Sequence, residues 1–358
     1  MSDSPTIEAV NQILHEIQDP ETGRSIVKTK QLYETHVDGN RIELNIGLTT
    51  HSLPIAGRFR DKIAKTLQNQ FAGSEVSINF RDHERRPPEI GQIGLRCRSV
   101  IAVGSGKGGV GKSTVATCLA LGLKRAGCKV GLMDADVYGP SVPQLIGVDG
   151  QPGKAGDKIA PIDADGMPVM SIGFMVPTEQ AVIWRGPMLH SAVTQFLRDT
   201  AWGDLDYLII DMPPGTGDVA LTLSQLMPAT GSVVVCTPQK VALLDAIKAL
   251  SMFDKVKIPV LGLVENMSSF ICPDNGKSYD IFGKGGVRKL AEQVQVPLLG
   301  ELPINISMRE RGDGGQTLSN FDDPQIEPYL TEMIENLVWG LAEKTADEPP
   351  QPSLPVLG

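Results

Sequence analysis

The stretch VIAVGSGKGGVGKSTVATCLALGL, residues 100–123, decides the fold of this chain. It contains the P-loop spacing G-x-x-x-x-G-K-S/T, which is filled by Gly106, Gly111, Lys112 and Ser113. In such a loop, backbone N–H groups surround a triphosphate, the lysine contacts its terminal oxygens and the hydroxyl binds Mg²⁺. Glycine is required because a side chain would block the close approach of the backbone. The spacing therefore predicts a nucleotide-binding loop.

The segments on either side of the loop support this interpretation. Residues 99–103 have the apolar composition of a short buried strand, and residues 113–125 form a helical pattern whose N-terminus would face the bound anion. A glycine-rich turn could match the spacing by chance, but a turn requires neither a strand before it nor a helix after it. The context favours nucleotide binding.

Size and charge are typical of an intracellular enzyme. The chain has 358 residues, enough for two domains, and its net charge of −9 argues against non-specific nucleic-acid binding, which depends on Lys and Arg. No apolar run approaches the roughly 18 residues of a membrane span, and the polar start MSDSPTIEAV is not typical of a signal peptide. We expect a cytoplasmic protein that binds neither nucleic acid nor membrane.

The cysteines are odd in number and widely scattered, which argues against a disulfide framework. They are Cys97, Cys118, Cys128, Cys236 and Cys272. Cys118 and Cys236 lie within apolar runs, so we expect both of them to be small core residues.

A charged segment with a Pro-Pro pair, HERRPPEIGQ at residues 83–92, suggests a linker between two domains. Residues 1–82 would form a small α/β domain, and residues 93–344 a larger P-loop domain. The proline-rich residues 345–358 are expected to be disordered.

Hydrophobic periodicity predicts the elements of both domains. The first domain has the pattern helix, strand, strand, helix and strand, at residues 7–17, 31–37, 41–48, 55–71 and 75–80. After the linker, helices alternate with apolar strands at residues 100–103, 130–133, 207–210, 233–236, 260–264 and 298–299. This alternation predicts a doubly wound, mostly parallel α/β sheet, in which ligands bind at the carboxyl ends of the strands.

Carboxylates follow two of these strands. Asp211 comes directly after residues 207–210, where it could hold Mg²⁺ directly or through water. Asp134 and Asp136 could orient the metal shell and the attacking water, although an Asp-x-Asp after a strand also fits turn chemistry or a helix N-cap. Gly215 could offer its N–H to the γ-phosphate and so distinguish ATP from ADP.

Longer strings around these residues resemble a known family. GKGGVGKS, at residues 106–113, resembles the deviant Walker A loop of the MinD, ParA and nitrogenase iron protein class of ATPases. Four more strings resemble the Mrp family of iron-sulfur cluster carrier ATPases: MDADVYGPS (133–141), VIWRGPM (182–188), IIDMPPGTGD (209–218) and ENMSSFICP (265–273). This resemblance runs from about residue 93 to about residue 341. DPETGRSIV (19–27) and LTTHSLP (48–54) resemble the MIP18-type module that is fused to many bacterial Mrp proteins.

The resemblance implies roles for individual residues. Lys107 would reach across a homodimer interface to the partner's nucleotide, where the concentrated phosphate charge suits a charge-assisted contact. Alternatively, Lys107 is an exposed lysine that only solvates the loop. The nucleotide-binding residues implied are Gly106, Lys107, Gly108, Gly109, Val110, Gly111, Lys112, Ser113, Thr114, Gly215 and Asn266.

Within this set, Lys112 would bind the β- and γ-phosphates and Thr114 would approach the α-phosphate. Ser113 would ligate Mg²⁺, which Asp211 would support through water, and Asp136 would help to activate the attacking water. Asn266 matches the asparagine that contacts adenine in the family, and its alternative is an ordinary turn amide. Lys107, Lys112, Asp136 and Asp211 are thus the candidate catalytic residues.

The chain departs from the family at its candidate cluster site. Mrp-type carriers usually have C-x-x-C after the N-M-S segment, and two chains then supply four thiolates to one bridging cluster. Here Cys272 is followed by Asn275 at the second position, and neutral asparagine is a poor ligand for iron. Asp274, or a thiol from another molecule, could complete the shell of a smaller or more labile cluster. Alternatively, Cys272 is an isolated thiol. Leu53 also stands before Pro54, where the MIP18-type module often has cysteine.

Three functions fit these observations. The leading hypothesis is a homodimeric ATPase that binds ATP and Mg²⁺ and delivers iron-sulfur clusters from a scaffold to recipient apoproteins, with Cys272 as the iron ligand. A MinD- or ParA-like positioning ATPase is less favoured because the helical pattern at residues 325–344 is acidic, and acidic residues are repelled by an anionic membrane. The third hypothesis is a nucleotide-gated scaffold that has lost cluster binding.

Overall fold

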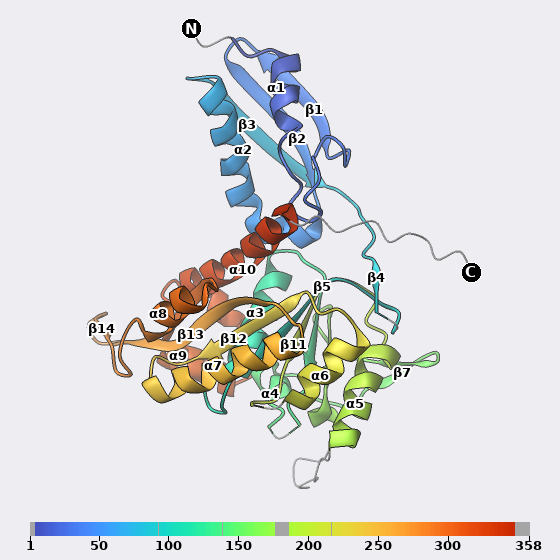
Figure 1. Cartoon of the computed structure of the whole chain (residues 1–358), viewed down its shortest axis with the longest axis vertical. Helices are drawn as coiled ribbons and strands as arrows, with labels where there is room; N and C mark the ends of the chain where they lie inside the picture. The colour runs from blue at the N-terminus through green and yellow to red at the C-terminus, as the bar shows by residue number, and fades with distance from the viewer. Residues whose placement is uncertain (1–3, 92, 138, 176–185, 216, 348–358) are drawn as a thin grey trace. The chain divides into compact units, whose positions relative to one another are not determined.

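The computed structural model describes residues 4–91, 93–137, 139–175, 186–215 and 217–347, and they form two compact units (Figure 1). The first unit contains the residues up to Arg85 and those from Val338 onward. The second unit is Arg86–Leu337.

The first unit contains a three-stranded sheet with the order β1-β2-β3, in which β1 and β2 are antiparallel and β2 and β3 are parallel. Its elements are α1 (Ile7–Leu14), β1 (Leu32–Asp38), β2 (Arg41–Leu48), η1 (Thr50–Ile55), α2 (Ala56–Gln70) and β3 (Glu75–Asp82). The predicted order of helices and strands is confirmed, with bounds that shift by a few residues.

Local sequence explains this unit. Thr6 caps α1 because its hydroxyl accepts the N–H of Ala9. Gly39 has a φ of +57°, which suits the tight turn between β1 and β2. In α2, Phe59 and Ile63 are four residues apart and both are buried against the sheet. The periodic pattern thus decides which faces form the core.

The second unit is built on a ten-stranded sheet, and its central strands are parallel. Its main path has the order β14-β13-β12-β5-β11-β6-β10-β9, with β15 beside β13 and β4 beside β5. These strands are β4 (Glu89–Ile90), β5 (Leu95–Gly104), β6 (Val130–Asp134), β9 (Ile162–Ala164), β10 (Met167–Ser171), β11 (Asp204–Asp211), β12 (Gly231–Cys236), β13 (Val260–Ile271), β14 (Ser278–Tyr279) and β15 (Leu298–Ile304). A separate hairpin joins β7 (Gly153–Ala155) to β8 (Lys158–Ala160).

Helices cover both faces of this sheet, as expected for a doubly wound fold (Figure 1). One layer contains α5 (Gly186–Asp199), α6 (Gly217–Leu226), α7 (Lys240–Lys255) and α8 (Gly286–Val294), whose neighbours contact one another. The other contains α3 (Lys112–Arg125), α4 (Val142–Ile146), α9 (Ile306–Asp313) and η3 (Thr317–Asp322). Two further elements are η2 (Ile172–Phe174) and α10 (Glu327–Asp347).

The central strands are apolar along their length because both faces of the sheet are covered. Every residue of β6 is buried, and so is all of β11 after Asp204. The fold class predicted from the sequence is therefore confirmed.

Three boundaries in the structure differ from those that the sequence pattern predicted. The segment at residues 83–92, predicted to be a linker, contains β4, which pairs with the start of β5. The strand predicted at residues 260–264 continues to Ile271, because β14 pairs with its end. The last helix extends to Asp347, so residues 345–347 are helical, while the rest of the proline-rich tail lies outside the described residues.

The structure also contains elements that the sequence pattern did not predict. The strands between residues 153 and 171 are short, and their apolar residues are too few to establish a period. None of the described helices combines the length and the apolar character that a membrane span requires.

Two helical glycines allow a test of the packing in the second unit and at the end of α10. A Cβ at Gly122, in α3, would collide with Ile334 and Phe321, whereas a Cβ at Gly340, in α10, would meet no atom within 4 Å. Alanine is favoured over glycine in a helix by about 1 kcal/mol, but overpacking a core costs about 1–3 kcal/mol. We expect Gly122→Ala to lower the thermal unfolding midpoint and Gly340→Ala to raise it. A Gly122→Ala protein as stable as the Gly340→Ala protein would contradict the packing of α3.

Candidate nucleotide and metal site

The predicted P-loop lies at the carboxyl end of β5 and leads directly into α3. Gly109 and Gly111 have φ values of +78° and +80°, a region in which side chains are strained, and Gly111 is the N-cap of α3. The first N–H groups of a helix have no acceptor within the helix and are therefore available to an anion. Thr114, in the first turn of α3, is half-buried.

Two loop glycines are crowded and two are open. A Cβ at Gly106 would collide with the backbone of Asp245 in α7, and one at Gly111 would collide with the amide of Asn266. Gly108 and Gly109 are exposed and have no atom near the position of a Cβ. The loop is thus fixed at both ends by close packing, while its middle faces solvent.

Lys112 is the buried cation of the site. Its side chain is 6% exposed, and Nζ lies 2.6 Å from Asp211 Oδ1 and 3.4 Å from Asp136 Oδ2. Nζ also lies 3.3 Å from Ser113 Oγ. Four of the predicted catalytic and metal-binding residues therefore meet at one point.

Parallel strand pairing explains this meeting. Asp211 ends β11, which lies between β5 and β6, and it is in register with Val103 on one side and Asp134 on the other. The carboxyl ends of parallel strands share one edge of the sheet, so the loops after β5, β6 and β11 must converge there.

Asp211 has a buried carboxylate that is only partly satisfied. Oδ1 accepts from Lys112, whereas Oδ2 is buried without a hydrogen-bond partner. Burial raises the pKa of Asp211, and the nearby charge of Lys112 opposes that rise. An unpartnered carboxylate oxygen beside the Ser113 hydroxyl fits the oxygen ligands that Mg²⁺ prefers.

Asp134 does not face Lys112 with a hydrogen bond but organises the chain after β6. Oδ1 accepts the N–H of Asp136 at 3.1 Å, and Oδ2 accepts the N–H of Val142 at 3.3 Å and the hydroxyl of Ser171 at 3.0 Å. Burial, followed by the charge of Asp211, raises the pKa of Asp134 to about 8. Asp134 thus positions the segment that carries Asp136.

Ser171 is a site residue that the sequence did not reveal. It ends β10, where it is in register with Asp134, and it is fully buried. No motif marks a serine at the end of a short strand, so only the pairing of β10 with β6 identifies it.

Lys107 and Gly215 lie at the edge of the loop. The Ser105 hydroxyl donates to the carbonyl oxygen of Lys107, which fixes the backbone there, and the Lys107 side chain is half-exposed. The N–H of Gly215 donates to the carbonyl oxygen of Ser105 at 3.1 Å. A contact between this N–H and a γ-phosphate stays a prediction, since the phosphate would have to replace that bond.

Asn266 contacts the P-loop itself. Its Nδ2 donates to the carbonyl oxygen of Val110 at 2.9 Å, and the side chain is 7% exposed. The predicted contact with adenine is not tested by this bond and stays a prediction. The alternative of an ordinary turn amide does not describe a buried bond to a residue 156 positions away.

Cys272 lies at the start of the turn between β13 and β14 and is half-buried. Its N–H donates to the carbonyl oxygen of Lys277, and its own carbonyl oxygen accepts from Gly276. Asn275, at the position of the second family cysteine, accepts the N–H of Lys277 through Oδ1. Asn275 therefore closes the turn, and among the described residues no group of three or more His, Cys, Asp or Glu side chains is arranged to bind a metal.

The other four cysteines are buried, which confirms the prediction for Cys118 and Cys236. Burial raises the pKa of Cys97, Cys118 and Cys236 to about 12, and it also raises that of Cys128. Buried thiols with a raised pKa are unreactive, so Cys272 is the accessible thiol of this chain.

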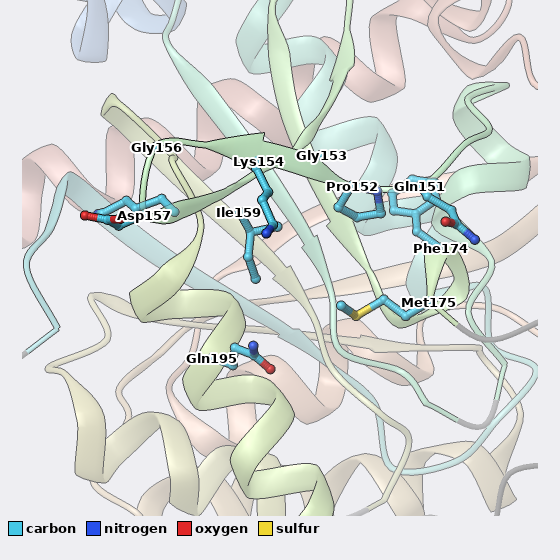
Figure 2. A pocket seen from close by; sticks show the side chains of 11 residues that line it. Gln151, Pro152, Gly153, Lys154, Gly156, Asp157, Ile159, Phe174, Met175 and Gln195 are labelled. Atoms are coloured by element: carbon cyan, nitrogen blue, oxygen red, sulfur yellow. The ribbon is translucent and has the colours of Figure 1, made fainter.

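A cavity of about 610 Å³ lies away from this site, between the β7–β8 hairpin and α5 (Figure 2). Lys154, Ile159, Phe174 and Met175 surround it, together with Gln195 from α5. None of the described residues predicted for nucleotide or metal binding lines this cavity.

Comparisons with known proteins cover both units. A family profile described as NUBPL iron-transfer P-loop NTPase matches residues 96–338, and one described as iron-sulfur cluster assembly protein matches residues 7–80. An iron-sulfur cluster carrier protein from Deinococcus radiodurans is 43% identical over 98% of this chain and 99% of its own length. An iron-sulfur cluster carrier protein from Escherichia coli is 53% identical over 67% of this chain and 65% of its own length.

Among solved structures, a nucleotide-binding protein from Archaeoglobus fulgidus in complex with ADP is similar to this chain. The two share 38% identity with a TM-score of 0.56, over 64% of this chain and 90% of the other. The likeness agrees with the P-loop fold of the second unit.

The hydrogen bond from Ser171 to Asp134 gives a pH-dependent prediction. Asp134 has a folded pKa raised to about 8 from its ordinary 3.8. The free energy of unfolding therefore falls as the pH rises between those values, because the carboxyl group ionises in the unfolded chain while it stays protonated in the folded one. Ser171→Ala removes a donor that favours the ionised form, so the folded pKa rises further. We expect Ser171→Ala to lower the free energy of unfolding by about 1–3 kcal/mol, more at about pH 9 than at about pH 6. Urea unfolding at both pH values measures the difference.

Ser232→Ala is the matched control, because the Ser232 hydroxyl is equally buried but donates to a neutral carbonyl oxygen, that of Pro259. Its cost should not change with pH. Equal pH dependence in the two variants would contradict the assignment of Asp134.

Proposed function

The chain belongs to the NUBPL iron-transfer P-loop NTPase family, and from this membership we propose that it is an ATP-binding and ATP-hydrolysing iron-sulfur cluster carrier that works as a homodimer. The observation that supports this most is the 43% identity to an iron-sulfur cluster carrier protein over nearly the full length of both chains. The position of Lys112 in a P-loop, between Asp211 and Asp136, agrees with it. The metal cluster is the cargo, and ATP is the ligand that controls it.

Lys112 is the residue whose contacts ATP binding would change first. A buried ammonium group without water needs negative partners, and Asp211 and Asp136 provide them in this structure. Triphosphate oxygens carry more concentrated charge, so they compete with the two carboxylates for Nζ. ATP binding then frees both carboxylates for the metal and the attacking water.

Mg²⁺ fits the residues around this cation. Ser113 Oγ and the unpartnered Oδ2 of Asp211 would hold it, the latter directly or through water. When bound, Mg²⁺ neutralises phosphate charge. Asp136, whose backbone is fixed by Asp134, orients and deprotonates the attacking water.

Lys107 completes the site from a second copy of the chain. The exposed Gly108 and Gly109 beside it leave the loop open to a partner. A cation brought from the partner stabilises the charge that develops on the phosphates, as preorganised cations do in phosphoryl transfer. Hydrolysis then depends on the dimer.

Cys272 is the residue that binds the cluster. Each chain supplies this one accessible thiol, so a homodimer offers two, whereas the common cluster types take four protein ligands. Thiols of a scaffold protein or of a recipient apoprotein complete the shell during transfer. A cluster held by two resident thiolates is labile, which suits a carrier, and the reducing cytoplasm would keep Cys272 available.

Replacing Lys112 tests the catalytic part. Lys112→Ala removes the cation that contacts the terminal phosphates, so we expect ATP hydrolysis to fall by about a hundredfold or more. Lys107→Ala should lower hydrolysis similarly while each chain still binds ATP. Phosphate release and the fluorescence of a labelled ATP analogue measure the two properties, and full hydrolysis by Lys107→Ala would exclude a role in trans.

Anaerobic reconstitution with iron and sulfide tests the cluster part. We expect the wild-type protein to retain iron and acid-labile sulfide, with the visible absorbance of a cluster, and Cys272→Ser to lose both. Cys128→Ser is the matched control because Cys128 is buried, and it should behave like the wild type. Equal retention by Cys272→Ser and wild type would remove Cys272 as the ligand and leave the ATPase proposal intact.

A further inference from the structure

Strand β13 connects the P-loop to the turn that carries Cys272. Its residue Asn266 contacts the loop, and its last residue, Ile271, directly precedes Cys272. One continuous strand therefore links the predicted nucleotide-binding loop to the accessible thiol.

The contact at Asn266 involves a peptide group that also faces the nucleotide site. The carbonyl of Val110 and the N–H of Gly111 belong to one planar trans peptide, so they point in opposite directions. Asn266 Nδ2 holds the carbonyl at 2.9 Å, which directs the Gly111 N–H away from Asn266. Gly111 must be glycine partly because a Cβ there would collide with the Asn266 amide.

The part of β13 before Asn266 is fixed on both sides. Glu265 is in register with Cys236 of β12 and with Glu301 of β15, and its carboxylate accepts the N–H of Val287 in α8. Asn266 is still paired with Leu302. The strand up to this point is thus a rigid part of the central sheet.

Beyond Asn266 the strand changes character. Met267 has a φ of +58°, which is uncommon for a residue with a side chain. Five described non-glycine residues have a positive φ; Met267 lies inside a strand, and the other four lie in turns or at helix ends. The pairing with β15 also shifts register between Asn266 and Phe270. The pairing with β12 ends at Glu265, and beyond the register shift Phe270 is paired with Ile304 of β15 on one side and with Tyr279 of β14 on the other. Ile271 pairs with Ser278 of β14 and leads into the Cys272 turn.

We propose that Asn266 is a positioning residue that couples the occupancy of the P-loop to the arm formed by residues 267–279, which carries Cys272. This rests on the proposed function only in requiring that the P-loop binds a nucleotide. A phosphate that accepts from the Gly111 N–H polarises the same peptide and strengthens the bond from Asn266 to the Val110 carbonyl, because hydrogen bonds in series reinforce one another. The tighter bond fixes the strand at the point where the arm begins.

The consequence is that nucleotide restrains the arm. Met267 is the position at which the arm can move relative to the sheet, because its positive φ lies where the pairing of β13 with β15 is interrupted, between Asn266 and Phe270. Release of the nucleotide loosens Asn266 and makes the Cys272 thiol more accessible for exchange with another thiol or a metal.

The rate at which Ellman's reagent modifies Cys272 in the full chain tests this coupling. The other four cysteines are buried, so the fast phase reports on Cys272 and should disappear in Cys272→Ser. We expect saturating Mg-ADP to slow this phase by about fivefold or more, the usual size of coupling between two sites. The slowing should be the same across a dilution series, which separates coupling within one chain from burial in a dimer.

Asn266→Ala should reduce the ratio of the rates with and without Mg-ADP to about one, under conditions in which a fluorescent ADP analogue shows that the site is filled. Asn336→Ala is the matched control, because Asn336 also donates Nδ2 to a strand carbonyl, that of Leu299 at 2.8 Å, away from the P-loop. It should retain the wild-type slowing. If Asn266→Ala does not fold, Met267→Gly decides the question, since it leaves the Asn266 bond in place and should weaken the slowing by freeing the arm.

Two results would overturn the coupling alone: no slowing in the wild type although Mg-ADP binds, or unchanged slowing in Asn266→Ala or Met267→Gly with the site filled. Failure of the wild type to bind Mg-ADP would overturn both the coupling and the proposed ATPase.

Discussion

The buried ammonium group of Lys112 between Asp211 and Asp136 is the interaction on which the site depends. Burying a charged side chain away from water costs free energy unless it is paired with an opposite charge. Removing one partner of a buried ion pair typically lowers the free energy of unfolding by about 3–5 kcal/mol. The fold meets this cost by bringing three parallel strands to one edge of the sheet. In the proposed function, phosphate oxygens and Mg²⁺ replace these contacts between charged side chains.

Strand β13 gives the nucleotide site a physical connection to the accessible thiol. Glu265 and Asn266 hold it to the sheet and to the P-loop, while Met267 begins a segment with different pairing. A carrier has to hold its cargo firmly in one state and release it in another. The proposed coupling of the Asn266 hydrogen bond to the nucleotide would provide such a difference through one strand.

The turn after β13 contains the position at which the chain departs from the family's cysteine pair. Asn275 stands at the position of the second family cysteine, and its side chain accepts the N–H of Lys277 within the turn. With one accessible thiol per chain, the proposed cluster binding requires thiols from other molecules.

The sequence by itself determined the fold class, the P-loop and the role of the buried strands, because periodicity, glycine spacing and strand-end carboxylates are local signals. It placed Lys112, Asp211 and Asp136 in one site because parallel strands end at one edge. Only the tertiary structure revealed Ser171 beneath Asp134 and the contact of Asn266 with Val110. It also decided that β13 continues to Ile271 and that α10 extends to Asp347. These features arise from pairing and packing between residues far apart in the chain, and no local pattern records which distant partner a residue meets.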